Sequence, residues 1–296
     1  MEANKRKGIV LNLIEKQKTK SKEETEMKRK LDVIRRTVAF AVGMALLALT
    51  VLLGVSNVYA TPDRKKNCAA CHTSRGSSKG FTDSFMLEEC HGFSSTGSNP
   101  YFVLEPNYQL VLEGKEKKRN AHLTITVLNE TNTIKVDIGG VATDVETRVV
   151  EERETWDGVL AEVSRNYFAI CDRTNSVFYF GEDVDIYDAT GTIIVSHDGS
   201  WLAAPDGPKP GIAMSGVILL GGKYFQEVAP NVAMDRAEII SMKEVVETPA
   251  GTFENCLKTR ETSSVEPGKA PKFYAPGIGL IKDGDLELTD YTVPVP

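Results

Sequence analysis

The sequence predicts a mainly β protein built from antiparallel strands, arranged either as a β-sandwich or as a curved sheet or open barrel. From Pro100 onward, short stretches alternate apolar and polar side chains, as strands with one buried face do. Turn residues separate these stretches at intervals of about 8–15 residues. Beyond Gly92 no stretch keeps a helical period, so helices are not expected in the body of the protein.

The expected strands share an alternating or β-branched composition and are bounded by turn residues. They cover residues 123–128, 147–155, 159–168, 177–187, 192–196, 235–246, 252–262, 272–274, 279–282 and 286–291. Asp157-Gly158 and Asp283-Gly284 are strong hairpin turns. The loop from Asp188 to Gly191 and the turn Pro249-Ala250-Gly251 predict two more hairpins. Trp156 and Trp201 fit a β core better than a cofactor site.

Charge is distributed unevenly along the 296 residues, which contain 35 Lys and Arg and 41 Asp and Glu. Residues 1–36 hold 12 basic and 6 acidic side chains, whereas residues 37–60 hold none. Residues 61–296 therefore carry 23 basic and 35 acidic groups, a net charge of −12. A body of this charge repels phosphate, which argues against a nucleic-acid partner.

The uncharged stretch 37–60 predicts export. Basic residues precede an apolar run over 38–55, and Val58-Tyr59-Ala60 resembles a cleavage site before Thr61. The run fits a cleaved secretory signal peptide or a single membrane anchor, and contact with the membrane is expected only there. In both cases residues 61–296 are exported, to the periplasm or the extracellular space. The first 26 residues are a basic tail, or translation starts at Met27.

A cysteine-histidine motif follows directly after this stretch. Cys68-Ala69-Ala70-Cys71-His72 has the C-x-x-C-H pattern of covalent haem c attachment. The two thiols at this spacing add to the haem vinyl groups, and the adjacent His72 becomes the proximal iron ligand. Over these five residues the sequence resembles c-type cytochromes, and this resemblance implies an electron-transfer role with an unknown redox partner protein.

Two other interpretations of the cysteines stay open. Exported thiols oxidise readily, so a disulfide among Cys68, Cys71 and Cys90 is one. The other is a zinc site formed by Cys68, Cys71 and two of His72, Cys90 and His91. If haem is bound, His91 is the preferred sixth ligand over Met86, although a solvent-exposed loop histidine explains His91 equally well.

These motifs divide the chain into three parts. Residues 1–60 form the N-terminal extension with the signal peptide or anchor, residues 61–98 a haem-attachment segment, and residues 99–296 the antiparallel β domain. The middle segment is too short for a hydrophobic core of its own, and only 81–90 is able to form a short helix. Cys171 and Cys256 either bridge two strands or are buried free thiols. If haem takes Cys68 and Cys71 and one disulfide forms, one cysteine is left over, and Cys90 is the expected one.

The β domain offers little catalytic chemistry. Ser215 lacks the spacing of a nucleophile elbow. His197 and Asp198 are adjacent in a strand, so their side chains point to opposite faces. The acidic run 182–188 lacks the loop pattern of a calcium site and fits a solvated strand face better. An electron carrier or a binding protein is therefore preferred to an enzyme.

Several segments resemble a group of uncharacterised exported bacterial β domains. They are Asn99-Pro100-Tyr101-Phe102 with Leu104 and Pro106, Tyr179-Phe180-Gly181-Glu182, Gly199-Ser200-Trp201, Gly251-Thr252-Phe253 and 274–280. The resemblance covers residues 99–291 and implies an exported β-rich fold without an established activity. The leading hypothesis is an exported c-type haem protein for electron transfer. The alternative is an exported β binding or interaction module whose Cys-rich leader is held by a disulfide or zinc.

Overall fold

A computed structural model describes residues 80–116, 118–265 and 270–292. A single 3-10 turn, η1 (Leu87–Cys90), precedes the strands. The chain then passes through β1 (Phe93–Ser94), β2 (Ser98–Asn99), β3 (Phe102–Val103), β4 (Gln109–Glu116), β5 (Arg119–Ile138), β6 (Val141–Trp156), β7 (Val159–Cys171), β8 (Val177–Tyr187) and β9 (Ile194–Ser196). It continues through β10 (Trp201–Leu202), β11 (Lys209–Met214), β12 (Lys223–Phe225), β13 (Glu227–Val228), β14 (Asp235–Thr248), β15 (Gly251–Ser263), β16 (Ala270–Ala275), β17 (Gly279–Asp283) and β18 (Leu286–Tyr291).

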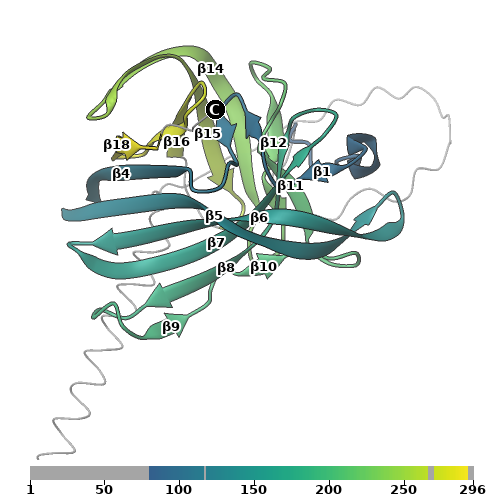
Figure 1. Cartoon of the computed structure of the whole chain (residues 1–296), viewed down its shortest axis with the longest axis horizontal. Coiled ribbons are helices and arrows are strands. Elements are labelled where there is room, and N and C mark those ends of the chain that lie inside the picture. The colour runs from purple at the N-terminus through teal and green to yellow at the C-terminus, as the bar shows by residue number, and fades with distance from the viewer. Residues whose placement is uncertain (1–79, 117, 266–269, 293–296) are drawn as a thin grey trace, which may run out of the picture.

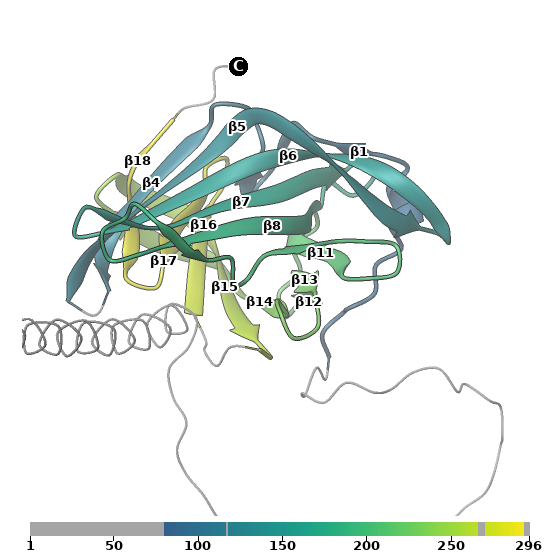
Figure 2. The ribbon, with the colours of Figure 1, turned by 90° about the horizontal axis from the view of Figure 1, so that it is seen from below.

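Sixteen of these strands form one large antiparallel sheet that curls into a nearly closed barrel (Figure 1), and β2 and β3 pair with each other in a separate small sheet. The order of the large sheet is β12-β14-β15-β16-β17-β18-β4-β5-β6-β7-β8-β11-β13. In Figure 2 the long strands β5 to β8 lie side by side and form one wall, with β15 to β17 behind them. The prediction of a mainly antiparallel β fold is therefore confirmed, and the arrangement is the curved, barrel-like one.

The two ends of the sheet meet at a seam, defined here as residues 225–227. The edge strands β12 and β13 are consecutive in the chain, with Gln226 between them, and they pair with β14 and β11. Gly211 of β11 lies so close that an added Cβ atom would be 2.5 Å from the carbonyl oxygen of Phe225. The missing side chain at Gly211 thus permits the two sheet edges to approach.

Local turn chemistry explains the long hairpins. Asp157 and Gly158, with φ of 50° and 79°, connect β6 to β7, as a hairpin of this length requires. The other predicted hairpins, at 188–191, 249–251 and 283–284, are also present, although β9 is shorter than expected. The expected core residues Trp156 and Trp201 are buried.

Two hydrophobic clusters lie on opposite faces of the long strands. On β7, Phe168 and Ile170 belong to the cluster inside the barrel, whereas Tyr167 and Ala169 belong to a second cluster outside it. The alternation of side chains along a strand produces this division. Leu87 of η1 packs into the outer cluster, so the N-terminal segment covers one end of the barrel wall.

A disulfide fixes this N-terminal segment. Strand β1 pairs with the end of β7, which brings the Cα atoms of Cys90 and Cys171 to 5.0 Å, and the two residues form a disulfide. The prediction that Cys90 is the unpaired cysteine is wrong, as is the bridge between Cys171 and Cys256. Cys256 is instead a buried free thiol on β15, which was the other interpretation of that residue. Within 81–90, where a short helix was expected, the 3-10 turn η1 covers only Leu87–Cys90.

Residues 1–79, with the export segment and the haem motif, lie outside the described residues. In the described part of the chain, no helix is long and apolar enough to cross a membrane.

Candidate functional site

The concave face of the sheet encloses a cavity of about 640 Å³. Strands from both walls contribute to it, and its lining reaches the exposed turn residue Asp157, which marks an open end. Apolar side chains make up much of the wall, but ten carboxylates also line it and only two basic side chains, Arg119 and Lys272. The carboxylates are Glu152, Glu154, Asp157, Glu162, Glu182, Asp188, Asp198, Glu227, Asp235 and Glu261.

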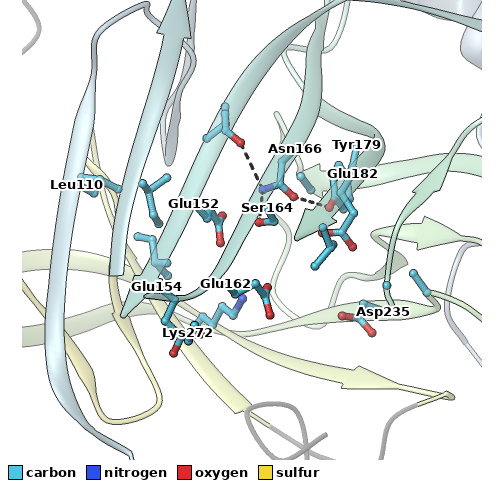
Figure 3. A pocket seen from close by; sticks show the side chains of 18 of the residues that line it. Leu110, Glu152, Glu154, Glu162, Ser164, Asn166, Tyr179, Glu182, Asp235 and Lys272 are labelled. Carbon is cyan, nitrogen blue, oxygen red and sulfur yellow. Dashed lines mark hydrogen bonds between the residues drawn. The ribbon is translucent and has the colours of Figure 1, made fainter. Parts of the chain in front are cut away.

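Strand register places three polar pairs in the cavity. Glu152 lies opposite Ser164, and Glu154 lies opposite Glu162. Figure 3 shows these side chains projecting into the pocket from neighbouring strands. Two acidic residues directly opposite one another on neighbouring strands destabilise a sheet. The pair Glu154 and Glu162 therefore does not serve to stabilise strand pairing.

The third pair joins β7 to β8, where Asn166 lies opposite Glu182. The Asn166 amide donates to Ser164 Oγ at 3.1 Å, and its carbonyl oxygen accepts from the Tyr179 hydroxyl at 2.5 Å (Figure 3). The Glu182 carboxyl group also interacts with the Tyr179 side chain. These contacts hold Tyr179 against the acidic side chain.

The outer face of the same strands has a different charge pattern. Arg165 of β7 lies 3.2 Å from Glu151 of β6 and 3.7 Å from Asp185 of β8. Asp185 is also 3.0 Å from His197, and Asp183 accepts from the Tyr167 hydroxyl at 2.5 Å. Carboxylates on the outside are thus matched by basic or hydroxyl groups, and the surplus of acid belongs to the inside.

The seam adds a further group of oxygen atoms. The Glu227 side chain is only 3% exposed and accepts the backbone N–H of Asp235 at 2.5 Å. Gln226 donates through Nε2 to Glu261 at 3.3 Å, and its Oε1 atom is buried without a hydrogen-bond partner. A buried acceptor of this kind costs free energy unless a donor reaches it.

Burial dominates the electrostatics of the cavity. It raises the pKa of Glu182 to about 8, and the charges of Glu152, Glu162 and Asp235 add to the effect. Burial and the charge of neighbouring Asp235 raise the pKa of Glu227 well above its usual value.

The same cause acts further along the wall, where burial raises the pKa of Glu154 to about 7. At neutral pH these carboxyl groups therefore retain protons that solvent-exposed carboxyl groups lose.

Lys272 of β16 is already engaged within this acidic environment. Its Nζ atom lies 3.0 Å from Glu261 and 3.4 Å from Asp283. Burial lowers its pKa, but the nearby acidic groups outweigh burial, and the pKa lies well above its usual value. The second base, Arg119, lies 3.7 Å from the centre of the Trp156 ring.

An aromatic wall lines the cavity next to Glu182. Phe168 stacks on Tyr179 with ring centres 4.8 Å apart, and Phe102 contacts Phe168 edge-on at 5.0 Å. Such a surface accommodates a flat apolar group, and its ring faces also attract cations. The cavity thus combines an apolar wall with a few convergent polar groups, which is typical of small-molecule sites.

Of the predicted haem-site residues the structure describes only His91, which does not line this cavity. Cys68, Cys71 and His72 lie outside the described residues. His91 follows η1 in a left-handed conformation, is exposed, and lines a shallow surface depression with Glu88 and Phe93. Cys90 is used by its disulfide, so it is removed from the predicted zinc ligands. No group of three or more His, Cys, Asp and Glu side chains suited to a metal ion is found within 80–116, 118–265 and 270–292.

The acidic run 182–188 is divided between the two faces of β8. Asp183 and Asp185 lie on the outer face, as predicted, but Glu182 lines the cavity rather than a solvated surface. Sequence reasoning assigned none of the cavity carboxylates to a binding site, although the run 182–188 and Asp198 were considered. A usable pattern was present, because Glu152 and Glu154 are two positions apart in a strand and project to one face.

Comparison of the chain with protein-family models, with curated proteins and with solved structures found no match.

Proposed function

We propose that this protein is an exported binding protein that holds a small organic molecule inside its barrel. The observation that carries the proposal is the cavity of about 640 Å³, which has the size of known small-molecule pockets. Its aromatic wall offers apolar surface for a ligand to pack on, and its hydrogen-bonding groups can fix the orientation of that ligand. The disulfide between Cys90 and Cys171 ties the leader to the barrel, in keeping with a module held by a disulfide.

Binding of the neutral, polarity-sensitive dye prodan to the full-length protein, produced in an exporting host, tests this proposal. The dye is expected to bind with one-to-one stoichiometry and a blue-shifted emission, because the cavity wall is apolar. Ala213→Trp places a large side chain in the cavity lining and is expected to abolish binding.

Ala142→Trp is the matched control, because Ala142 is exposed at the hairpin between β5 and β6. Val150→Phe provides a second cavity-filling variant in case Ala213→Trp does not fold, since Val150 is buried and lines the same cavity. Unchanged binding in the folded cavity-filling variants would refute a site inside the barrel, and so would the absence of dye binding.

We also propose covalent haem c attachment as a second candidate function, supported by the motif Cys68-x-x-Cys71-His72 behind an apolar segment. Cys68 and Cys71 would form the thioethers, and His72 and His91 would ligate the iron. Expression in a host that matures c-type cytochromes should give a mass increase of one haem and a reduced-minus-oxidised absorbance change. Colourless protein with Cys68 and Cys71 paired would exclude this function, and a metal assay on that sample would test zinc.

A further inference from the structure

We propose that the ligand of the barrel is an organic cation, a protonated amine on an apolar or aromatic body. Its ammonium group would bind the oxygen atoms of Glu182, Gln226 and Glu227. This inference rests on the proposed function, because it specifies the ligand of the same cavity.

The first argument is the imbalance of charge in the cavity. Among the described residues, no Lys, Arg or His forms an ion pair with Glu182 or Glu227. Lys272 is occupied by Glu261 and Asp283. Yet on the outer face of the same strands Arg165 bridges two carboxylates. Glu182 and Glu227 have no basic partner in the described structure, whereas Glu151 and Asp185 on the outer face do, and this difference fits a site whose counter-ion is the ligand.

The second argument is the unsatisfied acceptor at the seam. Gln226 Oε1 is buried without a donor, and the adjacent Glu227 carboxylate accepts a single backbone N–H in the described structure. Glu182, Gln226 and Glu227 line the same cavity, and an ammonium group provides three N–H donors for acceptors of this kind.

The aromatic wall defines the rest of the ligand. The Tyr179 side chain interacts with Glu182 and stacks on Phe168 through its ring. An aromatic body packed on this wall would therefore place a short amine-bearing arm beside Glu182. A bare metal ion is disfavoured, because calcium needs several oxygen ligands on one tight site and the described chain contains no such group.

Three probes with the same skeleton and different charge test this inference. Phenethylamine, phenethyl alcohol and hydrocinnamate are titrated calorimetrically into the full-length protein at neutral pH. The amine is expected to bind about tenfold or more tightly than the alcohol, because charge-assisted hydrogen bonds contribute more than neutral ones. The carboxylate is expected not to bind. Repetition in buffers of different ionisation enthalpy should show proton release on amine binding, because the raised pKa of Glu182 leaves this carboxyl group protonated in the free protein.

A matched pair of variants locates the amine. Glu182→Gln should weaken amine binding about tenfold and leave alcohol binding unchanged, whereas Asp185→Asn on the outer face of β8 should change neither. If Glu182→Gln fails to fold, Glu227→Gln replaces it in the same experiment and should give the same result. If the alcohol binds as tightly as the amine and prodan still binds, the inference of a cationic ligand is refuted, but the proposed binding site inside the barrel is not. Failure of all three probes and of prodan would overturn both.

Discussion

Replacing Glu182 by Gln should make the stability of the protein less dependent on pH. The pKa of Glu182 is raised from its ordinary 4.5 to about 8, chiefly by burial. The folded protein therefore holds a proton that the unfolded chain has already lost. The stabilisation from this proton is complete below pH 4.5 and is lost as the pH rises towards about 8.

The size of the effect follows from the same values. A pKa that rises from 4.5 to about 8 corresponds to about 5 kcal/mol in full, at about 1.4 kcal/mol per pKa unit. Between about pH 5 and 8 the loss amounts to about 3.5 kcal/mol. Because Glu182 is only partly buried and borders an open cavity, solvent screening halves this to about 2 kcal/mol.

Urea unfolding at several pH values between about 5 and 8 measures this difference. The wild-type protein should lose about 2 kcal/mol more of its unfolding free energy over this interval than Glu182→Gln does. Glu254→Gln is the matched control, because Glu254 is exposed on β15. Parallel pH profiles for wild type and Glu182→Gln would refute the burial of this carboxyl group inside the barrel.

The seam, the disulfide and the core each give a further expectation. Gly211→Val should lower the unfolding free energy by about 2–4 kcal/mol in urea and weaken prodan binding, because its side chain would push the sheet edges apart. The double variant Cys90→Ala, Cys171→Ala should have an unfolding free energy lower than that of the wild type by up to about 4 kcal/mol, because the disulfide links residues 81 positions apart. Leu288→Ala should cost about 2–4 kcal/mol in the same assay, since Leu288 is fully buried, and no loss would contradict its place in the core.

The sequence allowed the hairpins to be predicted because their determinants are local. Asp157 and Gly158 adopt the left-handed conformations that a short hairpin needs, and alternating side chains flank them. Closure of the barrel depends on contacts between β11 and the seam, where Gly211 meets Phe225, and no local pattern encodes that approach. The choice between a sandwich and a barrel was therefore left open by the sequence.

Long-range contacts also explain the errors in the cysteine pairing and in the acidic run. Cys90 and Cys171 are 81 positions apart and meet only because β1 pairs with β7. Glu182 faces inward while Asp183 faces outward, and the irregular register beside Gly181 determines this assignment. The haem motif is fully local, so it was found from the sequence alone, and its chemistry stays a prediction.

A crystal structure of the complex with phenethylamine tests the central claim most directly. The account predicts the phenyl ring on the wall formed by Phe168 and Tyr179. It predicts the amine nitrogen at about 2.7–3.1 Å from oxygen atoms of Glu182, Gln226 or Glu227. A ligand bound outside the barrel, or one whose amine points away from these oxygens, would contradict it.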